Sequence, residues 1–299
     1  MTSADLELQI ASQSKQIVLM AALLLVVLVV ASIALRDRAP KLKPWLFGML
    51  SATLIIPTLF MIISTIYVNT KSESGGPVHW HAGIEFWACG AELELRNPSG
   101  LLSNKVGTST YHEHNDKYIH LEGNVMEKRV DASLEKFMRV TGGNISKSSV
   151  GIPLSTEESA WIAQGDKLDG DQQGAMSSEM LKEYIIHSTE GPVAQFTNSQ
   201  KCNDSPAELQ TFVYKFNTAN NTYYQRKLSN PSEYIMSEES SLGPPSDCVI
   251  VEFDTPKDKT DKLCEQYGVK DADRCLDFGV KPDKKQICDI REVTEASND

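Results

Sequence analysis

Two long apolar runs near the N-terminus constrain the fold of this 299-residue chain more than any other feature of its sequence. Residues 17–35 carry no charged side chain over 19 positions, and residues 45–68 carry none over 24. A helix rises about 1.5 Å per residue, so each run is long enough to cross a hydrocarbon core of about 30 Å. Trp45 and Tyr67 stand near the ends of the second run, where such rings settle at membrane interfaces. The sequence therefore predicts a transmembrane helical hairpin within residues 1–70.

The charges that flank the two runs predict how this hairpin is oriented. The linker at residues 36–44 holds four positive side chains and one negative, whereas the outer flanks offer only Lys15 and Lys71. Positively charged loops stay on the cytoplasmic side of a membrane. We therefore expect a multi-pass protein of the cell membrane, with its N-terminal tail and its large C-terminal region outside the cytoplasm. A cleavable signal peptide is disfavoured, because a basic start and a small-residue cleavage site are lacking.

Charge and composition exclude some classes of partner and function for this chain. The chain carries 29 Lys and Arg against 40 Asp and Glu, a net charge of −11, and it has no run rich in Lys and Arg. Nucleic-acid affinity comes largely from such cations neutralising phosphates, so nucleic acid is not an expected partner. The two apolar runs contain no ionisable side chain, which disfavours transport by this chain alone.

All six cysteines follow the second apolar run, in the region that the charges place outside. An even number of cysteines in an oxidising compartment indicates disulfides, and no Cys-x-x-Cys spacing suggests a metal or redox motif. We expect one bridge between Cys202 and Cys248, which adjoin predicted strands, and a second among the last three cysteines. The disulfide candidates are Cys89, Cys202, Cys248, Cys264, Cys275 and Cys288.

After the hairpin the hydrophobic pattern predicts mainly β-structure, and hence an α+β fold with a disulfide-containing extracytoplasmic region. Residues 79–95 alternate around a turn at Cys89-Gly90, and residues 111–122 alternate around Asn115-Asp116. Asp131 is placed to cap a short helix that carries Leu134, Phe137 and Met138 and ends at Gly142-Gly143. Further strands are expected at residues 209–216, 222–228 and 248–253, with a helical stripe at 180–185 and a helix opening at Thr255.

The chain is expected to divide into four parts. The tail and transmembrane hairpin occupy residues 1–70, and a histidine-rich β domain occupies 71–145. A partly helical connecting region follows at 146–195. Residues 196–299 form a second β unit with a helical, cysteine-containing tail.

Five of the six histidines fall within 42 residues, as two His-x-His pairs and a single. On a strand, side chains at positions i and i+2 point to the same face about 7 Å apart, so each pair can close on one ion. Two such strands side by side bring four imidazoles together, and the single histidine supplies a fifth. We therefore predict a metal site made of His79, His81, His112, His114 and His120. The alternative is that these are ordinary polar side chains on the wet face of a sheet.

The donor set also favours certain metals. Imidazoles without thiolates suit Zn²⁺, Cu²⁺, Ni²⁺ or Fe²⁺ better than Ca²⁺ and Mg²⁺, which prefer oxygen, and copper or zinc is the favoured cofactor. Glu122, which shares strand parity with His120, and Asp116 are candidates to add a ligand or orient an imidazole. Glu85 and Glu113 lie near enough in sequence to do the same. His187 stands apart and is predicted to be structural.

The residues around these histidines resemble a group of uncharacterised, membrane-anchored, extracytoplasmic proteins of bacteria and archaea. The resemblance rests on HWHA, a hairpin through CG, HEHNDKYIHLEG and DASLEKFMRVTGG, and it covers residues 78–143. It implies the same membrane-anchored arrangement for this chain. It implies no catalytic residue.

Three functions remain open on the sequence. The first is a membrane-anchored, extracytoplasmic protein that holds or delivers a transition metal. The second is a non-catalytic, disulfide-stapled surface protein that serves structure or interaction. The third is a metalloenzyme with an open position on the ion and Glu113 or Glu122 as general base. No phosphate-binding glycine loop, Gly-x-Ser-x-Gly elbow or His-Glu-x-x-His motif is present, so we expect a binding protein rather than an enzyme.

Overall fold

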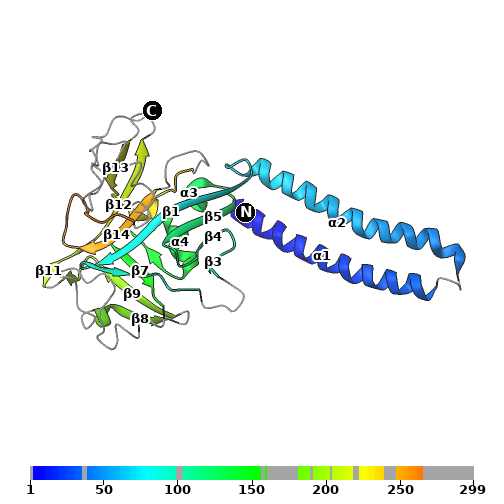
Figure 1. The fold of residues 1–299 in the computed structure, drawn as a ribbon, viewed down its shortest axis with the longest axis horizontal. Coiled ribbons are helices and arrows are strands. Elements are labelled where there is room, and N and C mark those ends of the chain that lie inside the picture. Colours follow the sequence, from blue (N-terminus) through cyan, green and yellow to red (C-terminus); the bar gives the residue numbers. More distant parts are fainter. Residues whose placement is uncertain are drawn as a thin grey trace, which may run out of the picture. The chain divides into compact units, whose positions relative to one another are not determined.

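The computed structural model of this chain is an α+β fold, as the sequence predicts (Figure 1). A hairpin of two apolar helices precedes a mainly β region that contains two disulfides. The chain divides into two compact units, Met1–Val78 with Asn124–Asp131 and His79–Gly123 with Ala132–Asp299. The structure describes residues 3–35, 39–98, 104–155, 159, 181–188, 191–202, 204–217, 222–238 and 247–264.

The first unit is built around helices α1, Ser3–Ala34, and α2, Lys43–Lys71, which pack side by side (Figure 1). A short 3₁₀ helix, Pro40–Leu42, leads into α2, and Pro57 lies inside α2 without ending it. Both helices are long and apolar enough to cross a membrane, and only 6% of the apolar window in each is buried within the protein. Exposure of this kind distinguishes them from the core helices of a soluble domain. The same unit holds the four-residue helix α3, Lys128–Asp131.

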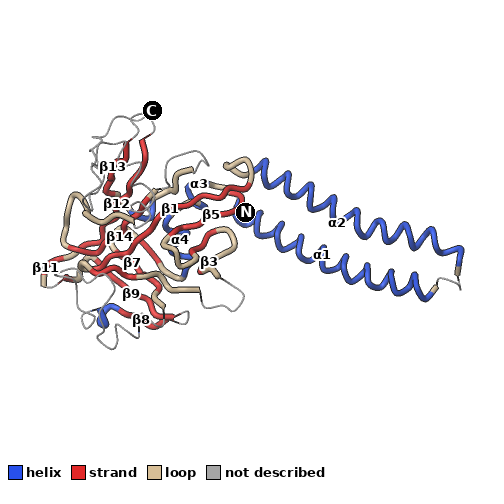
Figure 2. The backbone as a smooth tube through the Cα atoms, in the orientation of Figure 1, coloured by secondary structure: helices blue, strands red, loops and turns tan. Residues whose placement is uncertain are grey.

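The second unit is organised by an eight-stranded sheet of order β13-β12-β14-β1-β5-β4-β3, with β2 paired to β1 (Figure 2). The sheet contains strands at every segment where the alternation predicts them. Its strands are β1 Pro77–Ala88, β2 Ala91–Leu93, β3 Val106–Gly107, β4 Tyr111–Glu113, β5 Tyr118–Asn124, β12 Glu208–Asn217, β13 Thr222–Lys227 and β14 Cys248–Asp254.

Strand β14 joins the two ends of the β region, because it runs parallel to β1 and antiparallel to β12. Its register sets Gly83 opposite Cys248 and Ala88 opposite Phe253. The strands from the last third of the chain therefore share one sheet with the strand that carries the first two histidines.

A smaller, four-stranded sheet of order β6-β7-β9-β8 completes the unit, together with the two-stranded ribbon β10-β11. Leu181 is helical, but Lys182–Tyr184 forms a 3₁₀ turn and a strand starts at Ile185, so the stripe predicted at 180–185 is wrong where it is described. The bounds are β6 Asn144–Ile145, β7 Ser149–Pro153, β8 Ile185–Ser188, β9 Gly191–Thr197, β10 Lys201–Cys202 and β11 Ser205–Pro206.

The turn signals in the sequence are confirmed. Cys89 and Gly90 have φ values of 49° and 83° between the paired residues Ala88 and Ala91, the geometry of a two-residue hairpin turn. The β4–β5 hairpin turns through Asn115 with φ 66°, a conformation that asparagine tolerates well.

Helix α4, Leu134–Thr141, is confirmed, but its predicted cap is wrong by two residues. Ser133 is the N-cap, and its Oγ accepts a hydrogen bond from Lys136 N at 3.2 Å. Asp131 instead accepts from two backbone N–H groups of the preceding turn at 2.9 Å. Gly142 ends the helix with φ 93°, as expected.

The predicted Cys202–Cys248 bridge is wrong, and Cys264 pairs with Cys248 rather than with another of the last three cysteines. The bridges are Cys89–Cys202 and Cys248–Cys264, with Cα separations of 5.3 and 5.8 Å. Cys248 begins β14, whereas Cys202 Sγ lies 3.7 Å from the carbonyl of Phe253 near the other end of that strand, so these two cysteines cannot meet. Cys275 and Cys288 lie outside the described residues.

The second bridge also bears on the helix predicted to open at Thr255. Residues 255–264 contain no helix and instead follow the sheet, where Tyr214 donates a hydrogen bond to the Lys262 carbonyl at 2.6 Å. Cys264 is tied to Cys248 on the same sheet. These attachments tie the segment to the sheet, and they override its amphipathic pattern.

Candidate metal centre

Alternation along β1 and β5 turns their histidines away from the apolar core. Ile84 and Phe86 of β1, and Ile119 and Leu121 of β5, are all buried. Successive side chains of a strand point to opposite faces. The histidines at positions of the other parity therefore share the opposite face of the sheet.

Four of the histidines lie on three neighbouring strands, in the order β1, β5, β4, and His114 directly follows the end of β4. The sequence predicted that β1 and β4 would lie side by side, and this is wrong, because β5 lies between them. The reason is local: the β4–β5 hairpin sets His112 directly opposite His120, which leaves the other edge of β5 to pair with β1. His120 is consequently the central member of the cluster rather than a peripheral fifth.

Each His-x-His pair closes on itself as the spacing predicted. The Nε2 atoms of His79 and His81 lie 3.0 Å apart, and those of His112 and His114 lie 3.1 Å apart. Two nitrogens that each lie about 2.1 Å from one ion at an angle of about 90–110° are about 3.0–3.4 Å apart. Both pairs thus have the nitrogen separation that a shared metal ion requires.

His120 connects the two pairs. Its ring centroid is 4.8 Å from that of His81 and 4.7 Å from that of His114. It also stacks on His112, with centroids 5.5 Å apart and planes at 4°. The structure therefore brings all five predicted histidines together, and we call them the histidine cluster.

Two carboxylates border the cluster, both of which the sequence singled out. Asp116 Oδ2 lies 2.9 Å from His120 Nε2, and Glu122 Oε1 lies 3.2 Å from His79 Nε2. Carboxylates in such positions orient imidazoles or complete a coordination sphere. Asp116 and Glu122 can therefore each orient a neighbouring imidazole or add a ligand to a bound ion.

One contact that orients the cluster has no signal in the sequence. His114 Nδ1 lies 2.7 Å from the carbonyl oxygen of Asn104. A carbonyl only accepts hydrogen bonds, so Nδ1 carries the proton and Nε2 presents its lone pair to the cluster. Asn104 lies in a loop before β3, and only the fold brings its backbone to the histidines.

Burial keeps the inner histidines neutral. Desolvation lowers the pKa of His112 to about 4 and also lowers the pKa of His120. Metal ligation requires neutral imidazole, so both rings are in the state that binds an ion at neutral pH. Within the described residues, the Nδ1 atoms of His112 and His120 are buried without a hydrogen-bond partner.

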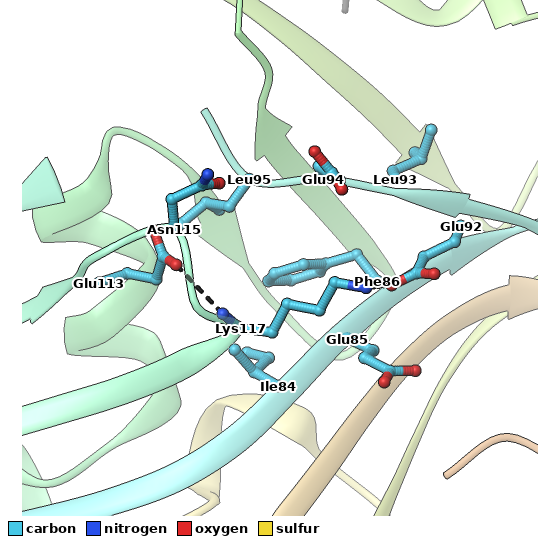
Figure 3. A pocket seen from close by; sticks show the side chains of 10 residues that line it. All are labelled: Ile84, Glu85, Phe86, Glu92, Leu93, Glu94, Leu95, Glu113, Asn115 and Lys117. Carbon is cyan, nitrogen blue, oxygen red and sulfur yellow. Dashed lines mark hydrogen bonds and ion pairs between the residues drawn. The ribbon is translucent and has the colours of Figure 1, made fainter. Parts of the chain in front are cut away.

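The remaining polar residues near the cluster have other surroundings. Glu85 accepts a hydrogen bond from Trp87 Nε1, and Glu113 accepts from the backbone N–H groups of Asp116 and Lys117. Both glutamates line a pocket of about 100 Å³ whose ten lining residues include no histidine (Figure 3). His187, predicted to be structural, lies exposed on β8 of the smaller sheet.

Comparisons of this chain with protein-family models, with curated proteins and with solved structures find no match. The resemblance to membrane-anchored proteins of bacteria and archaea therefore stays a prediction. The geometry of the cluster and the composition of the two helices are the features that bear on function.

Proposed function

We propose that this protein is anchored in the cell membrane by α1 and α2 and binds a divalent transition metal, with copper or zinc favoured, through the histidine cluster outside the cytoplasm. The observation that carries the proposal is the convergence of five imidazoles, with His120 at their centre. Nε2 atoms 3.0 and 3.1 Å apart fit a hydrogen bond between two imidazoles as well as a shared ion, and the gathering of two such pairs around a fifth ring is what favours the ion.

Burial supports a binding site over a solvated patch. His112 is fully buried and His120 is 9% exposed. Their Nδ1 atoms have no hydrogen-bond partner in the part of the chain that the structure describes, and proteins retain such costly buried polar groups chiefly where a ligand or a function requires them. The free energy of binding an ion can offset the cost of burying these two rings.

The extracytoplasmic location is supported by the disulfides and by the linker charges. Two bridges lie in the β region, and such bridges persist in oxidising compartments. The positively charged linker between the helices favours the cytoplasmic side. Both features support an extracytoplasmic location of the β region.

Metal content of the full chain tests the first half of the proposal. The protein is expressed without a histidine tag, solubilised in detergent, and measured by elemental analysis after dialysis against a Zn²⁺ or Cu²⁺ buffer. We expect at least one ion per chain in the wild type and in His187→Ala, and loss of metal in His120→Ala. A wild-type chain that retains no zinc or copper would refute metal binding.

Cysteine labelling in intact cells tests the topology. Asp5→Cys and Lys41→Cys variants are treated with a membrane-impermeant thiol reagent. Cys at position 5 is expected to react in intact cells, whereas Cys at position 41 is expected to react only after permeabilisation. The reverse pattern would invert the proposed orientation.

A further inference from the structure

The histidine cluster does not have the arrangement of a single coordination sphere. Its ligand atoms form two groups of three within 4.8 Å of one another, His79/His81/His120 and His112/His114/His120. No group of four or five meets that limit among the residues that the structure describes. Two nitrogens on one ion are at most about 4.2 Å apart, so one ion cannot take all five rings as they are placed.

Resting on the proposed function, we propose that the cluster binds two transition-metal ions: an outer ion at His79 and His81 and an inner ion at His112 and His114, with His120 shared between them. The outer pair and the inner pair already have the Nε2–Nε2 separation of a chelate, 3.0 and 3.1 Å respectively. A single ion could be chelated by only one of these two pairs, and the other pair would hold no ion.

His120 is suited to serve both ions. It lies on the central strand, and its ring centroid is nearly equidistant from those of His81 and His114, at 4.8 and 4.7 Å. Its Nε2 faces Asp116 at 2.9 Å, while its Nδ1 is buried and, among the described residues, has no hydrogen-bond partner. A neutral imidazole has one lone pair, so His120 can be shared between two ions only as imidazolate, its N–H proton passing to Asp116 Oδ2, 2.9 Å from Nε2, and from there to solvent.

The two carboxylates lie beside different parts of the cluster. Glu122 lies beside the outer pair, 3.2 Å from His79 Nε2, and Asp116 lies beside the shared ring. Glu122 is not a member of the outer group of three ligand atoms, so it is placed to orient His79 while His79, His81 and His120 supply the outer ion's three protein ligands.

The two positions differ in exposure, which gives them different roles. The His79 side chain is 62% exposed, whereas His112 is completely buried. The inner pair is also oriented by the Asn104 carbonyl, and loss of such an orienting contact weakens metal affinity about 10- to 100-fold. The outer ion is therefore the one that exchanges with solvent, and the inner ion is the one that is retained.

Zn²⁺ titration of the detergent-solubilised full chain tests the inference. The wild type and His187→Ala are expected to bind two equivalents, the second about tenfold or more weakly than the first. His79→Ala/His81→Ala should retain one tight equivalent and His112→Ala/His114→Ala one weak equivalent. His120→Ala should weaken both.

Cu²⁺ provides a second measurement that needs no variant. Two Cu²⁺ ions that share an imidazole couple magnetically, so the wild type loaded with two equivalents should give a half-field resonance in its electron paramagnetic resonance spectrum.

A wild type that saturates at one equivalent and gives no half-field resonance would overturn the two-ion inference while leaving metal binding intact. No bound metal at all would overturn the proposed function as well. Two equivalents that survive in His79→Ala/His81→Ala would show that the second ion lies elsewhere.

Discussion

His112 of β4 and His120 of β5 face each other directly across an antiparallel pair, and their imidazole planes lie 4° from parallel. Both rings are buried, and His120 lowers the pKa of His112 in addition to the larger effect of lost solvent. This stacked pair makes the stability of the metal-free fold sensitive to acid.

We expect the free energy of unfolding of the metal-free protein to fall as pH drops from about 6.5 to about 4. The pKa of His112 in the fold is lowered by desolvation to about 4, whereas histidine in an unfolded chain has a pKa of about 6.5. Between these values the unfolded chain binds a proton that the folded chain does not, so acid favours unfolding. Because one pKa unit corresponds to about 1.4 kcal/mol, His112 accounts for a loss of up to about 3 kcal/mol.

Urea denaturation in the presence of a chelator, at about pH 7.5 and about pH 5, should show about 2 kcal/mol of this loss. His112→Gln removes the titrating ring, so its stability should vary less with pH than that of the wild type, while His187→Gln should behave as the wild type. An unchanged pH dependence in His112→Gln would contradict the assignment.

Local signals account for the parts of the fold that the sequence predicts. The turn at Cys89-Gly90 and the hairpin through Asn115 follow from residues that accept positive φ, and the apolar runs of α1 and α2 follow from composition. The two His-x-His pairs follow from strand periodicity alone. These features depend on neighbours within a few positions of each residue.

The features that the sequence misses depend on contacts between distant segments. Gly83 of β1 pairs with Cys248 of β14 in a parallel arrangement, and no local sequence pattern predicts a pairing between segments so far apart in the chain. The same pairing decides the disulfides, because it carries Cys89 and Cys202 to one end of β14 and Cys248 to the other. His120 became central only because β5 lies between β1 and β4.

Removal of the Cys89–Cys202 bridge is expected to cost more stability than removal of Cys248–Cys264. The first bridge spans 113 residues and the second spans 16. In the chain-entropy model, loops of about 100 and about 15 residues contribute about 4.7 and about 3 kcal/mol. Urea denaturation of the two double Cys→Ala variants should therefore differ by about 1–2 kcal/mol.

Peptide mapping without reduction supplies the control for this comparison. It should recover cross-linked peptides that join Cys89 to Cys202 and Cys248 to Cys264. Recovery of a Cys202–Cys248 peptide instead would contradict the structure.

The ion pair between Lys257 and the buried Glu252 is a second source of stability. Lys257 Nζ lies 2.8 Å from Oε1 of Glu252, whose side chain is completely buried, while Lys257 is 26% exposed. Desolvation lowers the pKa of Lys257, but its hydrogen bonds to Glu252 and Asp254 outweigh this and raise it overall. The lysine is therefore charged in the fold.

Lys257→Met should destabilise the protein by about 2–3 kcal/mol, because it leaves the Glu252 carboxylate buried without its cation. Adding Glu252→Gln to that variant should recover part of the loss, since no buried charge then remains. A double-mutant cycle measured by urea denaturation checks this. Simple additivity of the two substitutions would show that the pair is not coupled.

Metal should stabilise the folded chain through His120. A ligand at 100 times its dissociation constant adds about 2.7 kcal/mol when it binds only the native state, and a domain of 150–250 residues gains about 2–4 °C in Tm per kcal/mol. Saturating Zn²⁺ should therefore raise the Tm of the β region by about 5–10 °C, and EDTA should reverse the rise. Because His120 belongs to both groups of three histidines, His120→Ala should abolish most of this shift, whereas exposed His187→Ala should retain it in full. A His120→Ala chain that still gains the full shift would mean that zinc stabilises the fold at a place other than the histidine cluster.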